Sequence, residues 1–317
     1  MKAVRSAGAF APASPWSRTV RSAGALAPAS PWSRTLKRAR YVHFFPKSAV
    51  WSPKPIAGAV AVAVALLLAA PIDARGGEST AHEPSYLLID AATGRVLDAH
   101  WDDPGRPLPM GSLIKPFTAL AYAEGHRFTY PTLVCRGSAG GCWLPAGHGR
   151  VSMAAAIAGS CNAYFRQLSQ GTSPDLLVSI LRRFGMRASA SDVTPASMVG
   201  LGESLKLAPS AIAHGYLEIV TRATQPGVAP IVEGMMTSSR TGTGRAVGAA
   251  LGHADAFVKT GTAPCVHPDK ASGDGYTVVV YPADRPRVVL IVQAHGRTGA
   301  ETAGLAGALL RSAVEVR

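Results

Sequence analysis

Four stretches of the chain have the apolar patterning of β-strands. Residues 85–90 (SYLLID) and 95–101 (RVLDAHW) flank a short turn, and this arrangement predicts a β-hairpin. Residues 276–281 (YTVVVY) and 287–292 (RVVLIV) are rich in valine and are joined by a loop with two prolines, which predicts a second hairpin. Residues 256–258 lead into a further strand that contains glycine.

Between the two hairpins, apolar residues recur with helical spacing. The segments expected to form helices follow chain breaks such as Pro109 and end at glycines such as Gly125. They are residues 112–124, 152–158, 161–169, 174–184 and 209–220, with a last helix over 298–316. Strands at both ends of the chain predict an α+β fold, in which one antiparallel β-sheet is flanked by helices and accompanied by a mostly helical subdomain.

Residues 1–55 differ in composition from the rest of the chain. They contain ten of the 32 Lys and Arg residues and no acidic residue, and residues 4–19 are repeated almost unchanged as residues 20–35. Because it lacks a periodic apolar face, this basic leader is expected to be disordered. Residues 56–317 retain 22 basic and 19 acidic residues, so the net charge of +13 falls mostly on the leader. This distribution argues against a nucleic-acid-binding surface on the folded part.

An apolar run, residues 56–70, follows the basic leader and resembles the core of a secretory signal peptide. Its fifteen residues are few for a membrane-spanning helix, which needs about 20. An uncleaved membrane anchor is the alternative interpretation. With residues 56–74 as signal peptide or anchor, we expect residues 75–317 to form one exported domain.

Three short motifs that combine hydroxyl, amine and amide side chains occur in order. They are Ser112-Leu113-Ile114-Lys115, Ser160-Cys161-Asn162 and Lys259-Thr260-Gly261-Thr262. A serine hydroxyl needs a base to become a strong nucleophile. A helix that begins at Ser112 would place Lys115 on the same face one turn later. Burial and the second cation, Lys259, would lower the pKa of Lys115, so that its neutral amine could accept the proton.

Composition supports this chemistry independently. Only four of the 22 basic residues in residues 56–317 are lysines, and two of them, Lys115 and Lys259, fall in the motifs. Arginine cannot replace an amine that must lose its proton. Asn162 is the only asparagine in the chain. The ordered set S-x-x-K, S-x-N and K-T-G is typical of serine β-lactamases and penicillin-binding proteins.

From about Ser85 to its C-terminus, the sequence resembles the transpeptidase domain of class B penicillin-binding proteins. Residues 88–97 are similar to the family's opening hairpin, residues 109–117 to its nucleophile segment, and residues 242–244 to the approach to K-T-G. The resemblance implies a serine D,D-transpeptidase that acts on peptidoglycan stem peptides and is acylated by β-lactams. It also implies cell-wall synthesis proteins as partners, no cofactor for catalysis, and a location in the periplasm or at the extracytoplasmic face of the inner membrane.

The family's roles carry over to the matching residues. Ser112 would be acylated, Lys115 would be the base in acylation, and Ser160 would relay a proton to the leaving group. Asn162 would hold the substrate amide and Lys115. The backbone N–H groups of Ser112 and Thr262 would form the oxyanion hole. Lys259 would be the fifth catalytic residue, and together with Thr260 it would position the substrate carboxylate. The substrate-binding residues would be Thr260, Gly261 and Thr262.

The same motifs leave other activities open. A serine β-lactamase shares the three residues Ser112, Lys115 and Lys259 but needs a base that activates water for deacylation. Glu203 is the one acid in a suggestive glycine-rich segment. A D,D-carboxypeptidase would transfer the acyl group to water, and a non-catalytic sensor or scaffold would bind peptidoglycan or β-lactams without turnover.

The four cysteines allow three interpretations. In an exported protein, Cys135 and Cys142 are candidates for a disulfide that closes a short loop. Alternatively, Cys135, Cys142, His148 and Cys161 form a Cys₃His set suited to a structural zinc ion with tetrahedral coordination. Free buried thiols are the third possibility.

Overall fold

The computed structural model describes residues 82–252, 255–267 and 269–315. The chain divides into two units, Met1–Ala74 and Arg75–Arg317, and all described residues belong to the second. The predicted basic leader (1–55) and the apolar run (56–74) lie outside the described residues. Across the described residues, no helix combines the length and the apolar composition needed to span a bilayer.

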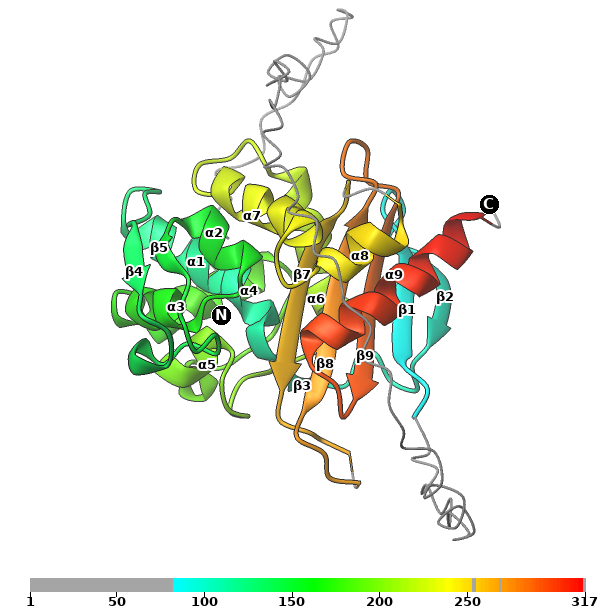
Figure 1. Ribbon diagram of the computed structural model, residues 1–317, viewed down its shortest axis with the longest axis horizontal. Helices are drawn as coiled ribbons and strands as arrows, with labels where there is room; N and C mark the ends of the chain where they lie inside the picture. The colour runs from blue at the N-terminus through cyan, green and yellow to red at the C-terminus, as the bar shows by residue number, and fades with distance from the viewer. Residues whose placement is uncertain (1–81, 253–254, 268, 316–317) are drawn as a thin grey trace, which may run out of the picture. The chain divides into compact units, whose positions relative to one another are not determined.

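A five-stranded antiparallel β-sheet forms the centre of the second unit (Figure 1). Its strand order is β2-β1-β9-β8-β7, so the first hairpin lies beside the last strands, as the sequence predicts. The strands are β1 Ser85–Asp90, β2 Val96–His100, β7 Phe257–Ala263, β8 Asp274–Tyr281 and β9 Val288–His295. Strand β7, which carries the K-T-G motif, is an edge strand of this sheet.

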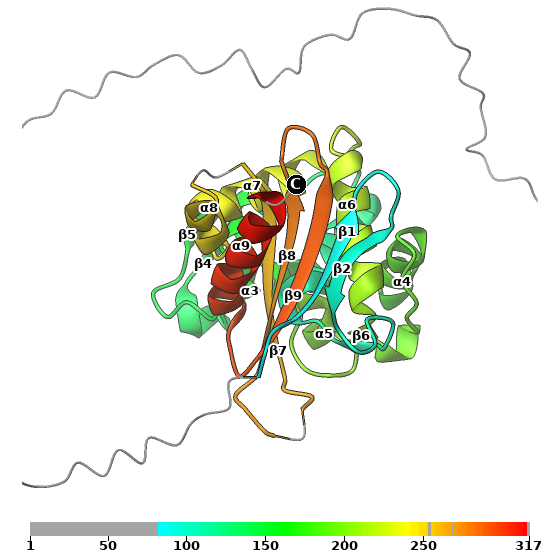
Figure 2. The same ribbon diagram turned by 90° about the vertical axis from the view of Figure 1, so that its right-hand side faces the viewer.

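Helices cover both faces of the sheet (Figure 2). Helix α9 (Gly299–Glu315) packs across β7, β8 and β9 with α8 (Arg245–Ala250) beside it, and α6 (Pro209–Thr221) packs on the opposite face. Successive residues of β8 therefore enter two different hydrophobic cores, as Val278 and Val279 do. A strand buried on both faces reads as a continuous apolar run instead of an alternating one, which explains the valine-rich sequence.

The segment between β2 and β7 builds the mostly helical subdomain. Its central helix α1 (Lys115–Gly125) is buried along most of its length. Helix α7 (Ala229–Arg240) packs against both α2 and β7 and so joins the subdomain to the sheet. The remaining elements are α2 Met153–Ala158, α3 Asn162–Gln170, α4 Pro174–Arg183, α5 Pro195–Val199, and two short antiparallel pairs, β3 Leu108–Pro109 with β6 Lys206–Leu207 and β4 Leu133–Cys135 with β5 Gly149–Val151.

The packing of the first turn of α1 gives one stability prediction. Phe117 is fully buried and packs edge-to-face against Phe184 and Tyr216, with ring centroids 5.6 and 5.7 Å away. We expect Phe117→Ala to lower the free energy of unfolding by about 3–5 kcal/mol, because it removes these contacts and leaves a cavity. Urea denaturation measures the change. The control is Phe128→Ala, since Phe128 is 49% exposed, and equal losses in both variants would contradict the assignment of this core.

Candidate active site

Ser112 lies at the junction between the sheet and α1. It is in a short 3₁₀ helix, η2 (Gly111–Ile114), which leads directly into α1, so the helix expected to begin at Ser112 begins with a 3₁₀ turn. Gly111 has a φ of 54°, and a Cβ on it would lie 2.3 Å from the carbonyl oxygen of Thr262. Only glycine permits this approach. The close contact therefore brings the serine segment against the K-T-G strand.

The amine of Lys115 is buried beside the S-x-N motif. Its Nζ lies 2.6 Å from Asn162 Oδ1, 2.9 Å from the carbonyl oxygen of Ser160 and 3.2 Å from Ser160 Oγ. A neutral amine can donate to the first two acceptors and keep its lone pair for a hydroxyl proton. Burial lowers the pKa of Lys115 to about 7, although thiolate charge at Cys161 and Cys142 would oppose this change. Lys115 can therefore act as a base near neutral pH.

Ser160 stands between two amines. Its Oγ lies 2.9 Å from Lys259 Nζ as well as 3.2 Å from Lys115 Nζ. Lys259 is also fully buried and donates to the carbonyl oxygen of Thr260 at 2.6 Å. Burial and the neighbouring Lys115 hold the pKa of Lys259 well below its ordinary value. The chain Lys115–Ser160–Lys259 can pass a proton along hydrogen bonds without exposing it to solvent.

The backbone at Ser160 is held in an uncommon conformation. Ser160 has a φ of 50° in the turn between α2 and α3, a region that residues with a Cβ adopt only rarely. The indole N–H of Trp143 donates to the carbonyl oxygens of Gly159 and Ser160 at 3.1 and 3.2 Å. Because the first residue of α3 is Asn162, this turn sets the positions of both polar side chains of the motif.

The K-T-G strand lies next to η2 along its free edge. The Thr260 hydroxyl donates to Thr243 Oγ1 at 2.7 Å, and Thr243 is itself anchored through its N–H to the carbonyl oxygen of Ala158. Thr262 Oγ1 accepts a hydrogen bond from the N–H of Gly299 at 2.9 Å. Gly261 faces the same segment, since a Cβ there would lie 2.7 Å from the carbonyl oxygen of Met110. The backbone of the strand at Gly261 and Thr262 thus lies against the segment that carries Ser112.

Three cysteines and a histidine gather behind the S-x-N turn. His148 Nδ1 lies 3.6 Å from Cys135 Sγ and 3.5 Å from Cys142 Sγ, and Cys142 Sγ lies 3.9 Å from Cys161 Sγ. All four potential ligand atoms lie within 4.8 Å of one another. Every cysteine among the described residues is a free thiol, so the structure contains no Cys135–Cys142 disulfide.

These separations match tetrahedral zinc coordination. Zn–S bonds of about 2.3 Å and Zn–N bonds of about 2.0 Å imply about 3.5 Å between sulfur and nitrogen and about 3.8 Å between two sulfurs. Burial raises the pKa of the Cys161 thiol to about 12 and lowers the pKa of His148, and each shift disfavours a charged side chain here. A bound cation would reverse this preference for Cys161, because metal coordination deprotonates thiols.

The structure joins four of the motif residues directly, since hydrogen bonds link Lys115, Ser160, Asn162 and Lys259. Ser112 lies in η2 three residues before Lys115, and Gly111 and Met110 of this segment meet Thr262 and Gly261 of the K-T-G strand. The motifs alone do not reveal two further residues, Thr243, which contacts Thr260, and Trp143, which fastens the Ser160 turn. Their signals are weak, since a GTG triplet and an exposed tryptophan are common in sequences.

Comparisons with known proteins identify the family and the fold. A family model described as the penicillin-binding protein transpeptidase domain matches residues 86–315. The transpeptidase domain of Burkholderia pseudomallei penicillin-binding protein 3 superposes with a TM-score of 0.58 at 19% identity, over 72% of this chain and 85% of that one. PBP2 of Pseudomonas aeruginosa superposes with a TM-score of 0.57 at 18% identity, over 71% of this chain and 70% of that one.

PBP2 of Helicobacter pylori, solved in complex with MreC, superposes with a TM-score of 0.59 at 17% identity, over 74% of this chain and 60% of that one. At these identities, the likeness to the solved structures shows the fold. None of the curated proteins matches this sequence.

The buried amine at Lys115 gives a direct titration prediction. In protein labelled with ¹³C at lysine Cε, we expect the Lys115 signal to titrate near pH 7, so that the amine is charged below this pH and neutral above it. Lys115→Arg identifies the signal, and the exposed Lys206 supplies the reference. A Lys115 signal that stays in its charged form up to pH 9 would contradict its role as a base at neutral pH.

Proposed function

This chain belongs to the penicillin-binding protein transpeptidase domain family, and on that premise we propose that it is a serine D,D-transpeptidase that cross-links peptidoglycan stem peptides. The observation that carries the proposal is the contact of two buried lysine amines with the single hydroxyl of Ser160, at 3.2 and 2.9 Å. This arrangement supplies a base three residues after Ser112, a proton relay, and a second amine that can bind a carboxylate.

The acylation step follows from these positions. Ser112 Oγ attacks the carbonyl carbon of the penultimate D-alanine and gives its proton to neutral Lys115. The negative charge on the carbonyl oxygen is stabilised by the N–H groups of Ser112 and Thr262. The C–N bond then breaks, and the proton reaches the departing D-alanine amine through Ser160. The products are free D-alanine and an ester on Ser112.

The fate of the ester distinguishes the candidate activities. In transpeptidation, the amine of a second stem peptide attacks the ester carbonyl, the amide bond forms, and Ser112 recovers its proton. A β-lactamase or a D,D-carboxypeptidase would use water in this step. The acid that the sequence puts forward for activating water, Glu203, is exposed in the turn after α5. This placement favours an enzyme that holds its acyl group for an amine acceptor.

One experiment separates the alternatives. The protein is mixed with a fluorescent penicillin, and labelled protein is followed over time. Fast labelling without release supports the transpeptidase, and rapid release supports a β-lactamase. The absence of labelling supports a non-catalytic scaffold. A stem peptide ending in D-Ala-D-Ala, given with and without an amine acceptor, then distinguishes a cross-linked product from simple hydrolysis by a carboxypeptidase.

We expect the β-lactam adduct to form on Ser112. Mass spectrometry of digested, penicillin-treated protein should find one adduct, on the peptide that contains Ser112, and Ser112→Ala should abolish it. Ser160→Ala should still form the adduct at Ser112, only more slowly, because Ser160 acts as a relay and is not the nucleophile. An adduct on Ser160 would overturn the assignment.

We also expect Lys115→Arg to reduce the acylation rate by about 10²–10⁴-fold, although it keeps the positive charge. Arginine cannot lose its proton in a protein, so it cannot take the serine proton. Lys259→Arg is the matched control at the other buried lysine, and it should retain more activity because its role is to bind a carboxylate. Near-normal acylation of Lys115→Arg would show that another group is the base.

The Cys₃His cluster is proposed to hold a structural zinc ion. The residues fit the metal in number, donor type and separation, and Cys161 lies between Ser160 and Asn162 in the sequence. The ion would fix the turn that presents both catalytic side chains. It would supply no chemistry to the serine reaction.

This zinc proposal predicts a coupled loss of metal and activity. Cys142→Ala should remove one zinc equivalent and slow acylation by about tenfold or more, because the Ser160 turn loses its support. Metal analysis of protein purified without chelator, and penicillin labelling, measure the two effects. His214→Gln, a substitution at an exposed histidine of α6, is the matched control outside this cluster and should label normally. Unchanged zinc content in Cys142→Ala would reject the site.

Location and partners follow from the proposed substrate. Peptidoglycan stem peptides lie outside the cytoplasmic membrane, so the proposal requires export, for which residues 56–74 are the predicted signal or anchor. PBP2 of Helicobacter pylori was solved in complex with MreC, and we include a cell-wall synthesis partner of this kind in the proposal.

A further inference from the structure

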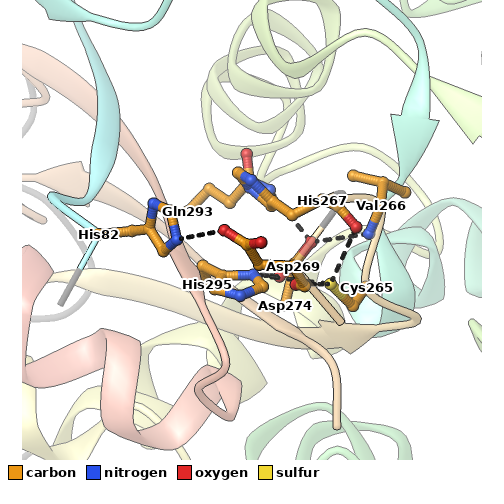
Figure 3. A network of polar contacts seen from close by, with 8 residues as sticks. All are labelled: His82, Cys265, Val266, His267, Asp269, Asp274, Gln293 and His295. Carbon is orange, nitrogen blue, oxygen red and sulfur yellow. Dashed lines mark hydrogen bonds and ion pairs between the residues drawn. The ribbon is translucent and has the colours of Figure 1, made fainter. Parts of the chain in front are cut away.

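A second cluster of metal-binding side chains lies at the end of the sheet where β7 connects to β8 (Figure 3). Cys265 follows β7, Asp274 is the first residue of β8, and His295 is the last residue of β9. One potential ligand atom from each of them lies within 4.8 Å of the other two. None of these residues belongs to the catalytic motifs.

The register of the sheet brings the cluster together. Asp274 and His295 are directly opposite each other in the β8–β9 pair, and Asp274 is also opposite Ala263 in the β7–β8 pair. Side chains of directly opposed residues share one face of a sheet, with Cβ atoms about 5 Å apart. Cys265, two residues after Ala263, is then carried to the same end of the sheet.

The distances fit one ion between three ligands. His295 Nδ1 lies 3.6 Å from Cys265 Sγ and 3.0 Å from Asp274 Oδ1. Tetrahedral coordination with zinc bonds of about 2.3 Å to sulfur and about 2.0–2.1 Å to nitrogen and oxygen implies separations of about 3.6 and 3.3 Å. A thiolate, an imidazole and a carboxylate form a donor set that zinc uses widely.

Hydrogen bonds orient the carboxylate of Asp274. Its Oδ2 accepts from the N–H of Val266 at 3.2 Å and from Gln293 Nε2 at 3.4 Å, which leaves Oδ1 directed toward His295. The side chain of Asp274 is 0% exposed, and His295 is its ion-pair partner. An ionised carboxylate is costly to bury without a compensating positive charge. A divalent cation at this point would supply that charge.

The geometry does not suit a Cys–His–Asp catalytic triad. In such a triad the imidazole uses one nitrogen toward the nucleophile and the other toward the carboxylate. Here Cys265 Sγ and Asp274 Oδ1 both approach the same atom, His295 Nδ1. A single ring nitrogen cannot donate a proton to one partner and accept a proton from the other. Three donor atoms converging on one point instead describe a coordination site.

Two further imidazoles border the cluster (Figure 3). The His267 ring centroid lies 4.5 Å from that of His295, and the His82 ring centroid lies 4.9 Å from it. His82 Nε2 is also 3.4 Å from a carboxylate oxygen of Asp269. Both histidines therefore adjoin the cluster and are the candidates for a fourth ligand.

We propose that Cys265, Asp274 and His295, with His82 or His267 as the fourth ligand, bind a structural zinc ion. The ion would tie the β7–β8 connection to the end of β9. Because β7 carries the K-T-G motif and is held by only one neighbouring strand, this tie would fix the end of the strand beyond Thr262. The proposal does not depend on which acyl-transfer reaction the enzyme performs.

Zinc content of the full chain tests the proposal. Protein expressed with added zinc and purified without chelator is analysed by elemental mass spectrometry. We expect Cys265→Ala and His295→Gln each to contain one zinc equivalent less than the unaltered protein. His214→Gln, a substitution at an exposed histidine of α6, is the matched control and should lose none. Near-ultraviolet circular dichroism confirms that each variant is folded.

Cobalt replacement identifies the ligands. In cobalt-loaded protein, Cys265→Ala should remove part of the thiolate-to-cobalt charge-transfer band, and Cys161→Ala should remove a separate part. Of His82→Gln and His267→Gln, the one that weakens zinc binding by about tenfold or more identifies the fourth ligand. The proposal is overturned if Cys265→Ala and His295→Gln retain the zinc content of the unaltered protein. It is equally overturned if neither His82→Gln nor His267→Gln weakens binding.

Discussion

The arrangement of the active site depends on the burial of two lysine amines beside one hydroxyl. Lys115 and Lys259 are both fully buried, and both contact Ser160 Oγ. Two ammonium ions so close together in a medium of low polarity repel each other strongly, so the pair is driven to release a proton. The same packing that hides the amines from water therefore produces the neutral base that a serine nucleophile requires. The hydroxyl of Ser160 contacts both amines, so it can carry a proton between them.

The two amines and the Ser160 hydroxyl keep these positions only if the surrounding backbone is rigid. Gly111 touches the backbone of Thr262, and Ser160 is held at a positive φ, a conformation that costs on the order of 1–3 kcal/mol. Neighbouring contacts must offset this cost. Trp143 bonds the carbonyl of Ser160, and Cys161, the next residue, points into the buried Cys₃His cluster. The strain and its support occupy adjacent residues, which suggests that the turn is held for its role in positioning Ser160.

The sequence predicts the fold class and singles out the motif residues of the candidate site because both depend on local signals. The hairpin strands, α4 and α6 have clear periodicity, and the three motifs combine residue types that this chain otherwise uses rarely, such as Lys and Asn. Helix α7 is not predicted, because its apolar face is interrupted by Gly234, which lets the backbone approach Ala154 on α2. That contact is tertiary, and the pattern of residues 229–240 alone does not predict it.

The two cysteine-containing clusters also show that contacts between distant segments are hard to predict from local sequence patterns. Cys135, Cys142 and His148 are near one another in the sequence, so their spacing alone suggests a ligand set. Cys265, Asp274 and His295 are spread over 31 positions, and only the pairing of β8 with β9 makes Asp274 and His295 neighbours. A site at the ends of three strands can be predicted only once the register of those strands is known.

The strand that needs such a tie is β7, since its outer edge borders the nucleophile segment instead of another strand of the sheet. In the proposed mechanism, an ion at the end of that strand would restrain Thr260 and Thr262 and, through them, the position of a substrate carbonyl relative to Ser112.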